Sequence, residues 1–163
     1  MAVRRSLNLE EEIVEAFERC GRVTEYLVTV VPRPLWLQPP PNGHGRTIAA
    51  IVAHMHGVRK TFAKMGGAAS APPLDRKTVT PAVARRAFRD INDVLAKQFR
   101  DALAARATRV KGMPRRSVEM MSYLTQHDAH HRGQIMLRAR ELGHEFSTED
   151  VMRIWGWKKM PVP

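Results

Sequence analysis

The sequence predicts an all-α protein that folds as a four-helix bundle with a short additional helix near its C-terminus. Three observations predict this class. Apolar residues recur at helical spacing over four long segments, capping residues and proline or glycine runs separate the segments, and no two segments alternate like paired strands. The chain has 163 residues, 44% of them hydrophobic, which is enough for one core. We therefore expect residues 1–163 to form one domain.

The first helix is expected over residues 7–30, where apolar residues follow helical spacing and three glutamates lie near the start. Acidic residues in the first turn are stabilised by the helix dipole. Between Val31 and Gly45, five prolines and two glycines exclude a helix and predict a long connection, which leaves room for a crossover. Trp36 is expected to pack this connection onto the bundle.

The second and third helices have clear start signals. Thr47 is a plausible N-cap for a helix that ends at Gly66 and Gly67, and Thr80 precedes Pro81 at the first position of the next helix. The third helix continues through the segment AVARRAFRDINDVLAKQFRDALAARA, which carries an apolar stripe from Val83 to Leu103.

The fourth helix is expected from Ser117 to Leu142, before Gly143. Ser147 opens the capping sequence STED, which predicts a short tail helix ending in IWGW.

The charge of the chain raises the question of a nucleic-acid partner. Lysine and arginine number 27 against 16 acidic residues, for a net charge of +11. The basic residues are spread, and the aromatic residues, only 6% of the chain, do not interleave with them to form a stacking surface. We expect no specific nucleic-acid binding, and a basic nucleic-acid-binding protein remains the least favoured alternative.

The sequence also indicates the compartment of the protein and whether it associates with a membrane. No apolar run approaches the roughly 20 residues that cross a bilayer. Acidic residues follow the N-terminal arginines where a signal peptide would be apolar, and the single Cys20 excludes an internal disulfide. We expect a cytoplasmic protein without a membrane partner.

The stretch QHDAHHRGQ, residues 126–134, places three histidines within five residues of the fourth helix. His127 and His131 lie about 40° apart around the helix and ~6 Å apart along it, so both imidazoles can reach one cation. They share their half of the helix with apolar residues, which predicts that they face the bundle. Gln134, one turn further, can reach the same site.

A third ligand is expected from the second helix, which offers His54 and His56. These positions differ by about 200° of rotation, so only one can face a given point. Both flank the apolar stripe, and periodicity barely separates them. Ile51 and Val58 lie on the side of His54, whereas Arg59 and Lys60 accompany His56, which favours His54 as the inward residue.

Proton transfer has one nearby candidate in the fourth helix. Asp128 lies about 100° from His127 and is expected to point elsewhere. His130 is the nearest residue for proton transfer or for support of a ligand, with partial exposure to solvent as its alternative role. Gln134 is expected to orient a ligand.

The segments TIAAIVAHMHGVRKTF and HDAHHRGQIMLRARELG resemble the DinB-like, or YfiT-like, family of metal-dependent enzymes, and EDVMRIWGW is similar to its C-terminal end. The most specific feature is H-x3-H followed by R-G-Q. The resemblance implies an up-down-down-up four-helix bundle that is often dimeric. It also implies a divalent metal held by one histidine of the second helix and two of the fourth, here His54, His127 and His131.

Three neutral imidazoles would leave coordination positions open, as in catalytic metal sites. We expect Zn²⁺ or Ni²⁺, and metal-assisted hydrolysis or thiol S-transfer on a small electrophile, since related families transfer groups to low-molecular-weight thiols. A metal-binding or stress-associated protein without turnover is the main alternative.

Overall fold

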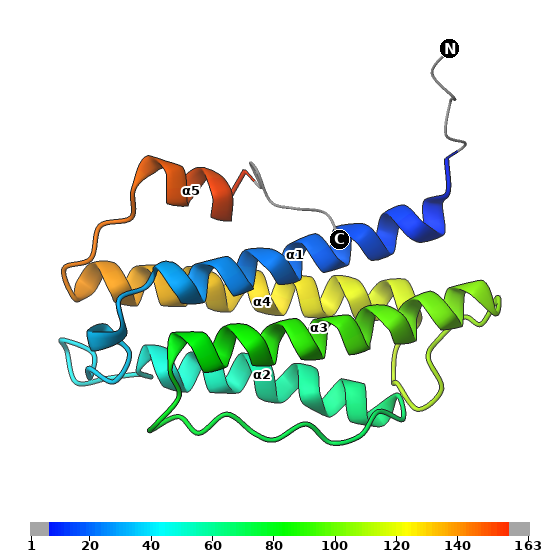
Figure 1. Ribbon diagram of the computed structural model, residues 1–163, viewed down its shortest axis with the longest axis horizontal. Helices are drawn as coiled ribbons and strands as arrows, with labels where there is room; N and C mark the ends of the chain where they lie inside the picture. Colours follow the sequence, from blue (N-terminus) through cyan, green and yellow to red (C-terminus); the bar gives the residue numbers. More distant parts are fainter. Residues whose placement is uncertain (1–6, 157–163) are drawn as a thin grey trace, which may run out of the picture.

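The computed structural model describes residues 7–156, and this part of the chain contains helices and no strand. Its elements are α1 (Leu9–Val30), a 3₁₀ turn η1 (Arg33–Leu35), α2 (Ile48–Met65), α3 (Pro81–Ala104), α4 (Ser117–Glu141) and α5 (Thr148–Ile154). The four long helices lie side by side, and α5 lies outside them against α1 (Figure 1). The all-helical prediction is confirmed, and the four long helices begin and end within three residues of the expected positions.

The predicted caps explain where the helices start. The side chain of Thr47 accepts a hydrogen bond from the backbone of Ala50, and Thr80 does the same for Val83. Each cap satisfies a backbone N–H group that has no partner inside the helix. Ser147 caps α5 in the same way, but α5 ends at Ile154, before the IWGW sequence is complete. Trp157 of that sequence and the N-terminal arginines lie outside the described residues.

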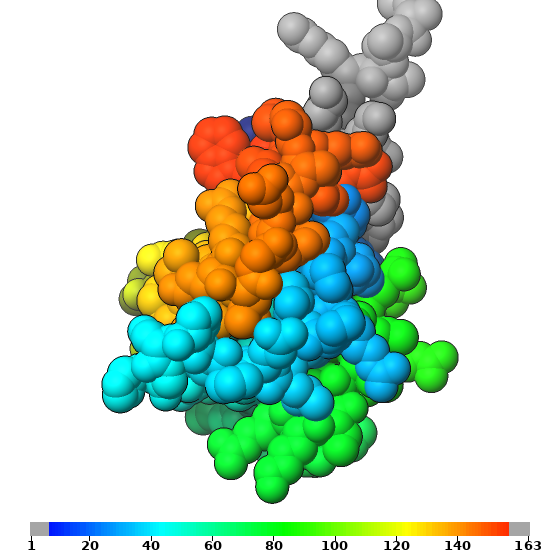
Figure 2. All heavy atoms as spheres, turned by 90° about the vertical axis from the view of Figure 1, so that its left-hand side faces the viewer, coloured from blue at the N-terminus to red at the C-terminus, as the bar shows by residue number. Residues whose placement is uncertain are grey.

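The long connection between α1 and α2 covers one end of the bundle. The side chain of Trp36 is 1% exposed, and its indole Nε1 donates a hydrogen bond to the carbonyl of Val31 at 3.2 Å. Figure 2 shows this connection, light blue to cyan, spread over the end of the bundle beside the orange end of α4. The prediction that Trp36 packs the connection down is confirmed.

The interior consists of two apolar clusters along the bundle. One contains Trp36, Ile48 and Phe88, and the other contains Phe17 and Phe99. The middle of α4 departs from this apolar pattern, because Asp128, His131 and Arg132 are also buried there. Buried polar groups require partners. The polar middle of α4 is therefore where a functional site is expected.

The connection between α3 and α4 depends on a glycine. Gly112 has a φ of +91°, and a Cβ there would collide with the carbonyl oxygen of Met65. Glycine therefore lets the connection between α3 and α4 pass close to the end of α2.

A side-chain hydrogen bond attaches α5 to α1: the hydroxyl of Tyr26 donates to Asp150 Oδ1 at 2.6 Å. Within residues 7–156, no helix is both long and apolar enough to cross a membrane.

Candidate metal centre

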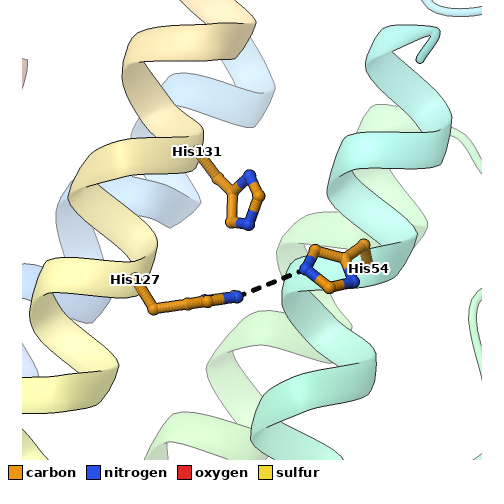
Figure 3. Close-up of side chains that lie close together, drawn as sticks. All are labelled: His54, His127 and His131. Carbon is orange, nitrogen blue, oxygen red and sulfur yellow. Dashed lines mark hydrogen bonds between the residues drawn. The ribbon is translucent and has the colours of Figure 1, made fainter. Parts of the chain in front are cut away.

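Three histidines from two helices converge beside the polar middle of α4. His54 comes from α2, and His127 and His131 come from successive turns of α4 (Figure 3). One ring nitrogen from each lies within 4.8 Å of the others. The Nε2 atoms of His54 and His127 are 3.3 Å apart. The structure therefore brings together the three residues that the sequence analysis named as metal ligands.

A hydrogen bond fixes the tautomer of His131. Its Nδ1 lies 2.7 Å from Oε1 of Gln134. An amide oxygen only accepts hydrogen bonds, so Nδ1 carries the proton and Nε2 of the neutral ring keeps a free lone pair. Gln134 therefore lies where it can orient His131, as the sequence analysis expected.

Asp128 faces the corresponding nitrogen of His127, at a longer distance and without a hydrogen bond. Its Oδ1 lies 3.6 Å from Nδ1 of His127, and neither buried atom has a hydrogen-bond partner among the described residues. The negative carboxylate favours the tautomer of His127 that carries its proton on Nδ1. In that tautomer the lone pair is on Nε2, which faces His54. The prediction that Asp128 points elsewhere is wrong. A rotation of about 100° between neighbours still lets a short side chain reach back to the preceding ring.

A buried ion pair holds the carboxylate of Asp128 in place. Nη2 and Nε of Arg59 lie 2.8 Å and 3.0 Å from Oδ2, and both side chains are fully buried. The hydroxyl of Thr24 donates to the same oxygen at 3.3 Å. Burial alone would raise the pKa of Asp128, but Arg59 and His127 lower it below its usual value. The carboxylate is therefore charged and fixed toward His127.

The surroundings of His54 and His131 favour neutral rings. Burial lowers the pKa of His54, and the nearby charge of Arg46 lowers it further. Burial likewise lowers the pKa of His131. A neutral ring is the form that binds a metal, because a protonated imidazole has no lone pair to donate.

The donor set fits a divalent cation. Two nitrogens bound to one tetrahedral Zn²⁺ at about 2.0–2.1 Å lie about 3.3–3.4 Å apart. The two Nε2 atoms of His54 and His127 are separated by 3.3 Å, and Asp128 and Gln134 orient the lone pairs of the α4 rings. A histidine whose far nitrogen contacts a carboxylate or amide oxygen is a common arrangement around protein metals.

His56 is more buried than the sequence suggested. It is 1% exposed and packs edge-on against Phe88 of α3, with its ring centroid 6.0 Å away. The expectation that His54 is the inward residue of the two is therefore wrong as an argument about burial. Arg59, used as an indicator of an outward face, is itself fully buried. His54 nevertheless faces the two α4 histidines, whereas His56 faces α3.

His130 lies at the exposed edge of the site. Its Nε2 accepts a hydrogen bond from Nε2 of Gln134 at 3.0 Å, and its ring centroid is 5.0 Å from that of His131. His130 is therefore linked to the three histidines through Gln134.

Sequence reasoning missed two residues of this site, Arg59 and Asp128. Helical spacing could have found both. Arg59 follows Val52 and Met55 on the buried stripe of α2, and Asp128 follows Leu124 on that of α4. Charged residues on buried stripes of facing helices indicate an internal ion pair.

The fold and the site together define a helical bundle with a three-histidine centre between two of its helices. A family model described as the DinB family matches residues 6–158, and the chain belongs to this family. Comparisons with curated proteins and with solved structures found no match.

Proposed function

We propose that this protein is a divalent-metal-dependent enzyme that acts on a small electrophilic substrate, by hydrolysis or by transfer to a thiol. The observation that carries the proposal is the cluster of three ring nitrogens within 4.8 Å of one another, two of them on rings whose other nitrogen faces Asp128 or Gln134. Three protein ligands leave coordination positions for water or a thiol, which is the pattern of catalytic sites.

We assign a separate role to each residue of the site. His54, His127 and His131 hold the metal, and Zn²⁺ or Ni²⁺ suits imidazole ligands. When bound, the metal supplies Lewis-acid chemistry and lowers the pKa of a water or thiol. Asp128 and Gln134 hold the α4 rings in their orientations. His130, exposed beside Gln134, accepts and returns protons at the edge of the site.

The proposal extends to the order of the helices and to assembly. We assign the up-down-down-up order of the family to α1–α4 and expect a homodimer. The order is supported by the connection between α2 and α3, which runs back along the bundle in Figure 1.

A metal-binding protein without turnover is the second candidate, because the same three histidines support it equally. A nucleic-acid partner has less support. Several arginines are engaged in ion pairs with acidic residues, among them Arg100 with Glu11 and Glu18, and Arg89 with Glu25.

The test is a comparison of metal-loaded and chelator-treated protein against a panel of small electrophiles, with and without a low-molecular-weight thiol. We expect turnover that requires the metal and disappears in His127→Ala. His144→Ala, in the connection between α4 and α5, is the matched control. Metal binding without turnover of any panel member would favour the second candidate.

A further inference from the structure

A hollow of about 470 Å³ is lined by His131, one of the three histidines of the predicted metal centre. His131 and Gln134 form one side of it, and Arg46 and Arg138 also line it. The remaining lining is Gly45, Ile51 and Leu137. The hollow therefore has a predicted metal ligand and two arginines in its lining.

The two arginines come from segments that are distant in the sequence. Arg46 belongs to the connection before α2, and Arg138 belongs to the last turns of α4. Gly45 has a φ of +101°, and a Cβ there would lie 3.3 Å from Nη2 of Arg138. Glycine therefore lets the connection approach Arg138 closely. Figure 2 shows the connection in cyan beside the orange end of α4.

The positive charge of this hollow is only partly neutralised. Arg138 forms an ion pair with Glu141 through Nη1, at 2.8 Å, and its buried Nε has no hydrogen-bond partner among residues 7–156. No ion pair of Arg46 occurs in that part of the chain, and its side chain is exposed.

A second hollow continues the same basic surface. It shares Gly45 and Arg46 with the first and adds Arg76 and Lys77. The opposite side of the site differs, because the hollow beside His127 and His130 contains Glu119 as well as Arg115. Electrostatic complementarity therefore favours an anion on the Arg46 side.

We infer that the substrate is a small molecule that carries a carboxylate or phosphate group, which lies against Arg46 and Arg138 while its reacting group faces the three histidines. Guanidinium groups recognise both anions through paired hydrogen bonds. The inference rests on the proposed function, because it uses the three histidines as the reactive centre.

Hydroxamates give a direct test, because the hydroxamate group binds divalent metals and the tail can be varied. One series carries carboxylate tails of two, three and four methylene groups, a second carries phosphonate tails, and a third carries neutral amide tails of the same lengths. Dissociation constants are measured by calorimetry on the full-length, metal-loaded protein. Metal content is determined first.

We expect the best anionic member to bind about three- to tenfold more tightly than its neutral counterpart, as for partly exposed charge pairs. Arg46→Gln should remove most of this preference, because Arg138 is already paired with Glu141, while the neutral series binds as before. Arg46→Lys should restore part of it. Arg140→Gln, exposed on the same helix as Arg138, is the matched control and should keep the full preference. The carboxylate and phosphonate series show which anion the site prefers.

Equal binding of anionic and neutral tails to metal-loaded protein would overturn the inference and leave the proposed function intact. Retention of the preference in Arg46→Gln would overturn it as well. Protein without metal, or metal-loaded protein that binds no hydroxamate, would contradict the proposed function and the inference together. Arg46 is exposed in a connection, so its replacement should not disturb folding; thermal unfolding of each variant verifies this.

Discussion

The two histidines of α2 differ in burial and in the residues that they face. His54 is partly exposed, and its Nε2 faces His127 of α4. His56, two positions later, is buried against Phe88, and its Nδ1 has no hydrogen-bond partner among the described residues. Burial lowers the pKa of both rings, that of His56 to about 4.

The difference shows that burial alone does not identify a metal ligand. A ligand needs other donors pointing at the same place, and only His54 has them. His56 behaves as a neutral core residue that is held by packing. The polar groups that contact the α4 rings, Asp128 and Gln134, both belong to α4, the helix that His54 faces.

The largest expected effect is on metal content, when His54 and His56 are replaced in turn. His54→Ala should lose nearly all bound metal, since it removes a donor atom, whereas His56→Ala should keep its metal content. Elemental analysis of the purified variants measures this. Metal loss in His56→Ala together with retention in His54→Ala would reverse our assignment.

The second prediction concerns acid stability and the part of it that His56 contributes. Its folded pKa of about 4 lies below the reference value of about 6.5 for an unfolded chain. The unfolded state therefore takes up a proton first as pH falls. The stability from the neutral ring is full above about pH 6.5 and is lost progressively toward pH 4, by up to about 3 kcal/mol.

His56→Phe should flatten this dependence, because it replaces the titrating imidazole with an apolar ring that is only slightly larger. Urea unfolding of metal-free protein at several pH values between 4 and 7.5 measures the free energy of unfolding. A pH dependence in His56→Phe as steep as in the unchanged protein would show that other groups cause it.

The third prediction concerns the carboxylate behind His127. Asp128→Asn removes the charge that orients the ring, and we expect metal affinity to fall by about 10- to 100-fold. The single replacement also leaves Arg59 buried without its counter-charge, which destabilises the fold by about 3–5 kcal/mol.

A double variant separates the two effects. In Arg59→Met with Asp128→Val, apolar side chains of similar combined size replace the buried pair, so stability should recover. Weak metal binding should persist, because His127 still lacks its carboxylate. Recovery of metal affinity along with stability would show that Asp128 acts only on folding.

The smallest expected effect is that of Gln134, which lies at the exposed edge. Gln134→Leu removes the acceptor for Nδ1 of His131, and we expect a loss of metal affinity of about tenfold, at the low end for supporting groups. Gln126→Leu, also exposed on α4, is the control. Competition with a coloured chelator measures both, and equal affinities would remove Gln134 from the site.

Much of the fold could be predicted from sequence because its determinants are local. Thr47, Thr80 and Ser147 cap the helices as expected, and proline and glycine runs mark the connections. The cluster of His54, His127 and His131 also followed from helical spacing and family resemblance.

The remaining features depend on contacts between distant segments. Arg59 and Asp128 form their buried pair across two helices, and charge alone suggested that such residues point outward. The contact of Gly45 with Arg138 depends on the path of an irregular connection, which has no periodicity to read.

The central claim is that three imidazoles bind one divalent metal, and X-ray absorption spectroscopy at the edge of the bound metal tests it most directly. We predict three imidazole nitrogens at about 2.0–2.1 Å for Zn²⁺, with oxygen ligands completing the shell and no sulfur. His131→Ala should lose this signature together with most of the metal. Full metal content with an unchanged spectrum in His131→Ala would contradict the account.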